Sequence, residues 1–364
     1  MKIRNYNIDL LRIFATFMII ILHILGQGGI LDASTQLNLK YGIVWFLELV
    51  CVGAVNIYAL ISGYVLCENE VKYHKIVVLW IEVFFYSFFI LIFFYFFRNK
   101  FNIDITFKLI VGNLFPLSNN LYWYFTSYFG MFLFIPLLNF IINNFPKKKL
   151  HICIFMGIVI YSFFPVVWVN DIFLFNNGYS VIWLAFLYVI GGYIKKYYFT
   201  SKLSKKKWLL IYFFSIFFAW FCIILLKILS FKIPILADFN FIFLGYNMLT
   251  TFIASISLFI FIININIKNT KIIKLITIFS PVTFGVYLIH TNPMIFNYIL
   301  KNSFIEYVNY NFVLLILFII ITAIVIYLIC TIIELFRIKL FNILNIDKKT
   351  KIIINKFGKK FGIL

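Results

Sequence analysis

Long apolar runs separated by short polar segments dominate this chain. We identify ten such runs, at residues 8–26, 43–66, 76–97, 121–142, 150–168, 179–196, 207–229, 241–265, 274–290 and 311–336. An α-helix needs about 20 mainly apolar residues to cross the hydrocarbon core of a bilayer. The pattern therefore predicts an all-α protein, a polytopic integral-membrane bundle of about ten transmembrane helices.

The segments between the runs are too short to form a soluble domain; the longest, 98–120 and 291–310, have about twenty residues. We therefore expect one membrane domain over residues 1–338, followed by a basic tail at 339–364. Scattered Ile, Leu and Phe in the tail fit an amphipathic segment lying on the membrane as well as they fit a frayed tail. We expect the first run to be retained as a span, because it lacks a small-residue cleavage site.

The composition agrees with a membrane protein. Apolar residues make up 64% of the chain and charged residues 12%, whereas soluble domains are typically about 45–50% apolar and about 25% charged. The five cysteines are scattered and contain no CxxC pair. We therefore expect neither a disulfide framework nor a metal site.

The net charge of +20 follows the predicted topology. With the N-terminus placed inside, 24 of the 32 Lys and Arg residues fall in inside segments and 7 in outside segments. By the positive-inside rule, this bias predicts that both termini are cytoplasmic. Topology and anionic membrane lipid account for the basic charge, so we expect no nucleic-acid partner.

The first apolar run carries a polar stripe formed by Asp9, Arg12, Thr16 and His23. On a helix, Arg12 and His23 differ by about 20° around the axis and about 16 Å along it. Ionisable residues inside a membrane span usually face the bundle interior and mark a functional path. The alternative is that Arg12 reaches the headgroups and His23 is a buried hydrogen-bonding residue.

Depth in the predicted spans sorts the other polar residues into two layers. The outer layer holds His23, Glu48 and His290, a set suited to general acid–base chemistry. The inner layer contains cations suited to a phosphate-bearing ligand from the cytoplasm; its members are Asp9, Arg12, Ser62, Glu82, Lys72, His74 and Lys75.

Four motifs resemble the integral-membrane acyltransferase 3 family, which O-acylates surface polysaccharides and related glycans. The Arg-x10-His signature falls on Arg12 and His23, and the segment NIYALISGYVL at 56–66 resembles the stretch ending in Ser-Gly-Tyr. The segment YWYFTSYFGMFLFIPLLN at 122–139 resembles the family's Trp-containing span, and VTFGVYLIHTNP at 282–293 its Tyr-Leu-x-His motif. The resemblance covers nearly the whole chain, which also resembles the capsule and exopolysaccharide O-acetyltransferases of Gram-positive bacteria.

The resemblance implies acyl transfer, expected to be acetyl transfer, from cytoplasmic acyl-CoA to a hydroxyl of a cell-surface or lipid-linked glycan at the bacterial cytoplasmic membrane. His23 is the candidate base, with Glu48 or Glu82 orienting it, or it carries the acyl group covalently. Donor binding is assigned to Arg12, Asp9, Ser62, Lys72 and Lys75. Acceptor binding is assigned to His290, Tyr287 and Trp123. Acetyl-CoA is expected as a co-substrate, without a resident cofactor.

One departure separates the chain from the family pattern. Many members carry an arginine pair after the Ser-Gly motif, whereas this chain has Lys72, His74 and Lys75. The role of that pair is therefore not transferred directly. A different class of protein, a transporter or flippase of lipid-linked oligosaccharide, also suits intramembrane charge, although we find no Gly- or Pro-broken inverted pair of spans.

Overall fold

The computed structural model describes residues 4–168, 175–198 and 203–360. These residues form helices joined by turns, and none of them lies in a β-strand. The longer helices are α1 (Tyr6–Leu25), α3 (Leu39–Val52), α4 (Ala54–Leu66), α5 (Tyr73–Phe96), α8 (Trp123–Leu133), α9 (Ile135–Asn144), α10 (Lys147–Ile158), α12 (Val181–Tyr197), α13 (Lys205–Ser230), α14 (Leu249–Ile263), α15 (Thr270–Phe279), α16 (Thr283–His290), α18 (Phe312–Ile343) and α19 (Ile346–Lys360).

The remaining elements are short. They are the α-helices α2 (Ile30–Ala33), α6 (Arg98–Phe101), α7 (Phe107–Leu114), α11 (Phe164–Trp168) and α17 (Pro293–Ile295), the π-helical turns Val159–Phe163 and Phe296–Leu300, and the 3₁₀ turns Asn176–Gly178, Pro234–Phe243, Ser280–Val282 and Ile305–Asn309.

Within the described residues, seven helical segments are long and apolar enough to cross a membrane. The bent pair α8 and α9 raises the number to eight if it is counted as one span. The all-helical membrane architecture is thus confirmed, whereas the expected count of about ten is not. The predicted span at 121–142 is bent by 58° between α8 and α9, and the run at 241–265 contains the 15-residue helix α14.

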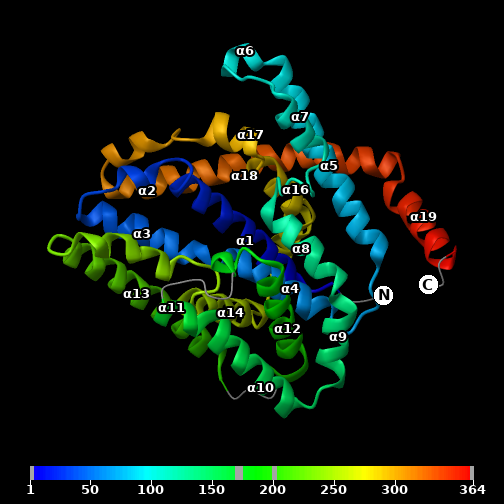
Figure 1. Cartoon of the computed structure of the whole chain (residues 1–364), viewed down its shortest axis with the longest axis horizontal. Coiled ribbons are helices and arrows are strands. Elements are labelled where there is room, and N and C mark those ends of the chain that lie inside the picture. The colour runs from blue at the N-terminus through cyan, green and yellow to red at the C-terminus, as the bar shows by residue number, and fades with distance from the viewer. Residues whose placement is uncertain (1–3, 169–174, 199–202, 361–364) are drawn as a thin grey trace.

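Helix α1 lies in the middle of the bundle, with α3, α4, α14, α16 and α18 around it (Figure 1). Its side chains at Leu11, Ala15, Ile20 and Leu25 are fully buried. The side chain of Asn7 fixes the start of α1 to the end of α14, because its amide donates to the carbonyls of Ile262, Ile263 and Ile265 at 2.8–2.9 Å. On the polar stripe of α1, Asp9 and Thr16 are buried, whereas the Arg12 side chain is partly exposed.

Helices α4 and α12 cross in close contact because both carry glycine at the crossing. A Cβ on Gly63 would lie 1.9 Å from the carbonyl oxygen of Tyr188, and one on Gly191 would lie 2.2 Å from that of Leu60. Any side chain at either position would separate the two helices. The glycine of the Ser62-Gly63 motif thus has a packing role.

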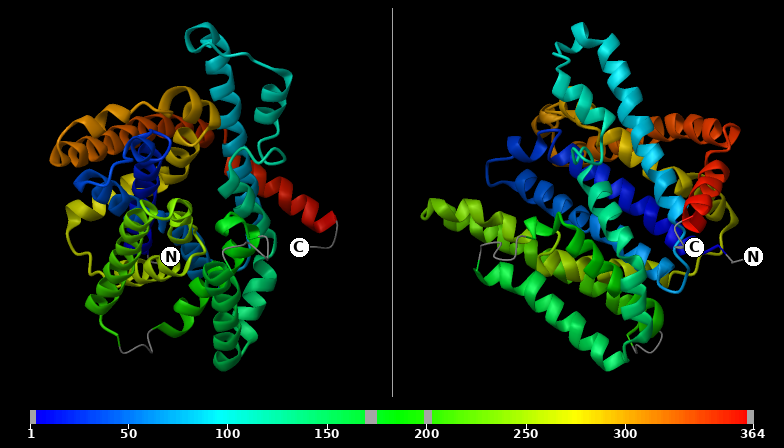
Figure 2. Two further views of the ribbon diagram at one scale, coloured as in Figure 1. Left: turned by 60° about the vertical axis from the view of Figure 1, so that its left-hand side comes forward. Right: turned by 45° about the vertical axis from the view of Figure 1, so that its right-hand side comes forward.

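Helix α5 passes along the bundle and projects from it together with α6 and α7, as Figures 1 and 2 show. In its buried half, Glu82 lies 3.2 Å from the guanidinium of Arg337 on α18, and Arg337 also pairs with Glu334. This cluster joins α5 to α18. The first and last described helices, α1 and α19, have their chain ends at the same end of the molecule (Figure 1).

Candidate active site

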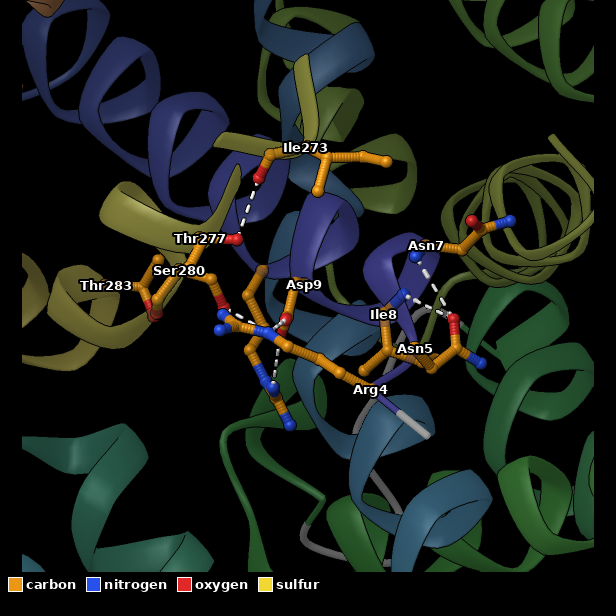
Figure 3. Close-up of polar contacts among 10 residues, drawn as sticks. Arg4, Asn5, Asn7, Ile8, Asp9, Ile273, Thr277, Ser280 and Thr283 are labelled. Carbon is orange, nitrogen blue, oxygen red and sulfur yellow. Dashed lines mark hydrogen bonds and ion pairs between the residues drawn. The ribbon is translucent and has the colours of Figure 1, made fainter. Parts of the chain in front are cut away.

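Asp9 gathers three donors near the start of α1 (Figure 3). Its carboxylate accepts from Arg4 Nε at 2.6 Å, from Arg12 Nη1 at 2.9 Å and from Ser280 Oγ at 2.8 Å. The Asp9 side chain is 8% exposed, whereas those of Arg4 and Arg12 are 40% and 33% exposed. The buried carboxylate therefore holds two guanidinium groups that remain accessible.

A pocket of about 840 Å³ opens beside this cluster. Arg4, Arg12 and Lys195 supply three cationic side chains to its lining, and Asp9 and Glu68 supply two acidic ones. Each arginine gives one N–H to Asp9, and a guanidinium has five. The pocket, which we call the inner pocket, can therefore receive an anion such as a phosphate.

A second hollow, of about 440 Å³, lies further along α1. We call it the outer cavity. His23, Glu48, Trp123 and Tyr287 all line it. The structure thus brings together four of the residues that the sequence assigns to catalysis and acceptor binding, from four different helices. The volume lies within the range of small-molecule sites in proteins.

His290 packs directly against His23. The two ring centroids are 5.2 Å apart, which confirms the expectation that these histidines lie at similar depth. The Nδ1 atom of His290 lies 2.6 Å from the carbonyl oxygen of Val286, so Nδ1 carries the proton that it donates there. In a neutral ring, the buried Nε2 is then an acceptor, and it has no partner among the described residues.

Other polar atoms around the outer cavity also lack partners within the described chain. They are His23 Nδ1, Glu48 Oε2 and the hydroxyl oxygen of Tyr124. Leaving a buried polar atom unpaired typically costs about 1–3 kcal/mol. Such a set is suited to a ligand that brings several hydroxyl groups.

An aromatic wall closes one side of the cavity. The rings of Trp123 and Tyr246 are stacked at 5.5 Å with an interplanar angle of 14°, and Tyr179 lies 4.2 Å from Trp123. Tyr179 and Tyr246 come from the segments before α12 and α14. This wall offers flat apolar surface with hydroxyl groups at its edge.

The two hollows meet at Thr283, which lines both of them. Next to this residue, the hydroxyl of Tyr58 is hydrogen bonded to the carbonyl oxygen of Arg12 at 3.0 Å and to Thr16 Oγ1 at 2.5 Å. Tyr58 also lines the outer cavity. We call Tyr58, Thr16 and Thr283 the constriction between the inner pocket and the outer cavity.

Four of the residues assigned from the sequence lie elsewhere. Ser62 donates to the carbonyl oxygen of Tyr58 at 2.9 Å, within α4. Glu82 pairs with Arg337 rather than with His23, and no hydrogen bond joins Glu48 to His23 in the described structure. Lys72 and Lys75 line a neighbouring hollow that shares Glu68 and Asn69 with the inner pocket.

The sequence interpretation missed Arg4, Lys195, Tyr58 and Tyr246. Arg4 precedes the first apolar run by only a few residues, so its position before an intramembrane acid was an available signal. Tyr58 and Tyr246 are two of 23 tyrosines, and nothing in their spacing distinguishes them. Thr283 lies in the motif at 282–293, where its hydroxyl was not considered.

Comparison with protein families gives one match that covers most of the chain. The model of the acyltransferase domain known as acyltransferase 3 matches residues 5–334. The matched region includes the outer cavity, the constriction and every lining residue of the inner pocket except Arg4. No curated protein and no solved structure matched the chain. With the match spanning nearly the whole length of the bundle, the chain belongs to the acyltransferase 3 family and is a multi-pass membrane protein.

Proposed function

We propose that this protein transfers an acetyl group from cytoplasmic acetyl-CoA to a hydroxyl of a cell-surface or lipid-linked glycan. The observation that supports the proposal most is the pair of hollows joined at Thr283. One is lined by three cations, and the other by His23, Glu48 and an aromatic wall. A phosphate-bearing donor and a polyhydroxylated acceptor thus have chemically matched sites on two sides of one constriction.

The donor is expected to place its phosphates against Arg4, Arg12 and Lys195, because guanidinium and ammonium groups form charge-assisted hydrogen bonds with phosphate oxygens. Lys72 and Lys75 line the hollow that adjoins the inner pocket, together with Glu68 and Glu70, and Lys75 is ion-paired with Asp347. The thioester arm then passes the constriction. His23 lies about 16 Å beyond Arg12 along α1, so the phosphates and the reacting carbonyl occupy separate sites.

In the transfer step, the acceptor hydroxyl attacks the thioester carbonyl and forms the ester C–O bond as the C–S bond breaks. His23 takes the hydroxyl proton and passes it to the departing thiolate, which leaves as the free thiol of CoA. Glu48 and the aromatic wall of Trp123 and Tyr246 hold the sugar. If His23 instead carries the acetyl group, the kinetics will be ping-pong rather than sequential.

The test measures CoA release by the purified protein in lipid nanodiscs, supplied with acetyl-CoA and glycan from the producing cell. We expect His23→Ala to abolish acetylation while the protein still inserts and expresses, because the hydroxyl loses its base. His151→Ala is the matched control, since His151 is exposed on α10 and contacts Tyr193. A transporter would release no CoA, and wild-type acetylation by His23→Ala would remove His23 from the mechanism.

A further inference from the structure

A third hollow of about 600 Å³ lies between α5, α16 and α18. Its lining is almost wholly hydrocarbon, and we call it the lipid groove. The exposed side chains on it include Phe89, Phe93, Ile299, Ile329 and Phe336. On α18 the lining residues run from Ile326 to Leu340, a length of about 21 Å at 1.5 Å per residue. The groove therefore matches a single hydrocarbon chain lying along the bundle.

The groove and the outer cavity share a thin wall. His290 lines the groove, and His23, whose ring centroid is 5.2 Å away, lines the cavity. Phe296 also lines the cavity and packs edge-on against His23 at 4.9 Å, while its neighbours Ile295 and Ile299 line the groove. The rings of His290 and Phe296 are thus the side chains that separate the groove from the candidate base.

The two polar residues on the groove lining, Arg337 and His290, differ in chemistry. Arg337 faces two carboxylates, Glu82 and Glu334, so it has no unbalanced positive charge for an anionic headgroup. His290 Nε2, on α16, is a buried acceptor without a partner in the described chain. A hydroxyl donor at that point would remove the cost of an unpaired acceptor.

The inference drawn from these features rests on the proposed function and narrows the class of acceptor. We propose that the acceptor is a sugar carried on a membrane lipid, whose hydrocarbon chain lies in the lipid groove while its sugar lies beside His23 and His290. The chain fits the apolar walls, and the sugar supplies the hydroxyl groups that the unpaired nitrogen requires. A water-soluble glycan has no hydrocarbon chain to place in the groove, so bulk membrane lipid would occupy it instead.

A photocrosslinking experiment tests the placement without requiring turnover. The probe is hexadecyl glucoside with a diazirine on its alkyl chain, added to the wild-type protein in phosphatidylcholine nanodiscs. We expect crosslinks in peptides covering 85–93 and 326–340, reduced by excess hexadecyl glucoside and not by methyl glucoside. Crosslinks spread evenly over the lipid-facing helices, including α13, would overturn the proposal.

Matched variants make the result specific. Ile329→Trp fills the groove, whereas Ile332→Trp places the same side chain on a lipid-exposed face of α18 outside it. We expect Ile329→Trp to lower crosslinking by about tenfold and Ile332→Trp to leave it unchanged. Ile299→Trp on the opposite wall provides a second blocking variant if Ile329→Trp fails to fold. The placement would be contradicted if the groove variant, Ile329→Trp or Ile299→Trp, crosslinked as strongly as the control Ile332→Trp.

CoA release keeps the two proposals separate. If the groove variants lower crosslinking but no acceptor causes CoA release, the proposed acetyl transfer is wrong and the lipid site is supported. If CoA release proceeds equally well with water-soluble glycan and with the lipid fraction, acetyl transfer stands and the acceptor class is wrong.

Discussion

At the scale of single residues, the main role of Asp9 is to fix the side chains of Arg4 and Arg12. It fixes one N–H of Arg4 and one of Arg12 in a buried contact and leaves the rest of each guanidinium toward the inner pocket. A carboxylate in this position restricts two flexible side chains before a ligand arrives. Ligand binding therefore costs less conformational entropy, because the two arginine side chains are already ordered.

Replacing Arg12 by Lys should weaken CoA binding by about tenfold, because charge is kept while the planar set of N–H donors is lost. Calorimetric titration of the purified variant with CoA measures the change. Arg98→Lys is the control, since Arg98 lies on the exposed helix α6. Unchanged CoA affinity in Arg12→Ala would mean that Arg12 serves only to pair with Asp9.

The sequence identified part of the site at this scale. The spacing of Asp9, Arg12 and His23 predicted a shared stripe on one helix. In the structure, Asp9 and Arg12 line the inner pocket and His23 lines the outer cavity. The position of Glu82 was not predictable, because the rotation of α5 determines whether it faces His23 or Arg337. Rotation of one helix relative to others depends on packing that a single amphipathic pattern does not contain.

At the scale of helices, the crossing of α4 and α12 sets the position of the inner pocket. Tyr64, Glu68 and Asn69 follow the crossing on the α4 side, and Lys195 comes from α12. The close approach at Gly63 and Gly191 therefore determines how far Lys195 lies from the arginine residues of α1.

Gly63→Ala should destabilise the protein by about 1–3 kcal/mol or more, because the new Cβ overlaps the backbone of α12. Thermal unfolding in detergent provides the measurement. Gly112→Ala is the control, since a Cβ at that position on α7 meets nothing within 4 Å. It should leave the melting temperature unchanged or raise it slightly. Equal melting temperatures for the two variants would show that the crossing adapts.

Helix α19 docks on the start of α5 through an ion pair between Lys75 and Asp347, 2.7 Å apart. The Lys75 ammonium lowers the pKa of Asp347 below its ordinary value. A depressed carboxylate pKa contributes stability above the unfolded-state value, near 3.9, and loses it as the pH falls. Both side chains are more than half exposed, so the contribution is below about 1 kcal/mol.

Asp347→Asn should therefore increase hydrogen exchange in residues 346–360 at pH 7, relative to the wild type. At pH 3 the difference should shrink, because protonation removes the same charge from the wild type. Asp32→Asn, an exposed acid on α2, controls for the general loss of a carboxylate. A difference that is as large at pH 3 as at pH 7 would show that the charge of Asp347 does not hold α19.

At the scale of the whole molecule, the hydrophobic pattern predicted the presence of membrane helices better than it predicted how many there are. Each of the ten apolar runs contains helix, yet only seven segments of the described residues pass as complete spans. The length of an apolar run does not reveal that α8 and α9 bend by 58°, nor that the run at 241–265 becomes α-helical only from Leu249.

The orientation in the membrane stays a prediction from the charge count. In intact cells, single cysteines placed in the 27–40 and 291–310 loops should react with an impermeant maleimide, while one at Lys205 should not. The background lacks the native cysteines, of which Cys153 is exposed. Labelling at Lys205 from outside would reverse the orientation and exchange the donor and acceptor sides.

The constriction has a consequence for the cell's energy supply. An enzyme that passes an acyl group between two compartments must do so without conducting protons, since each charge crossing 100 mV dissipates about 2.3 kcal/mol. The Tyr58 hydroxyl is closed onto Thr16 and the Arg12 carbonyl at the junction. Under the proposed acyl transfer, we expect Tyr58 to move aside for the thioester arm and to return between turnovers, so that the side chain that admits the proposed donor also keeps protons from crossing.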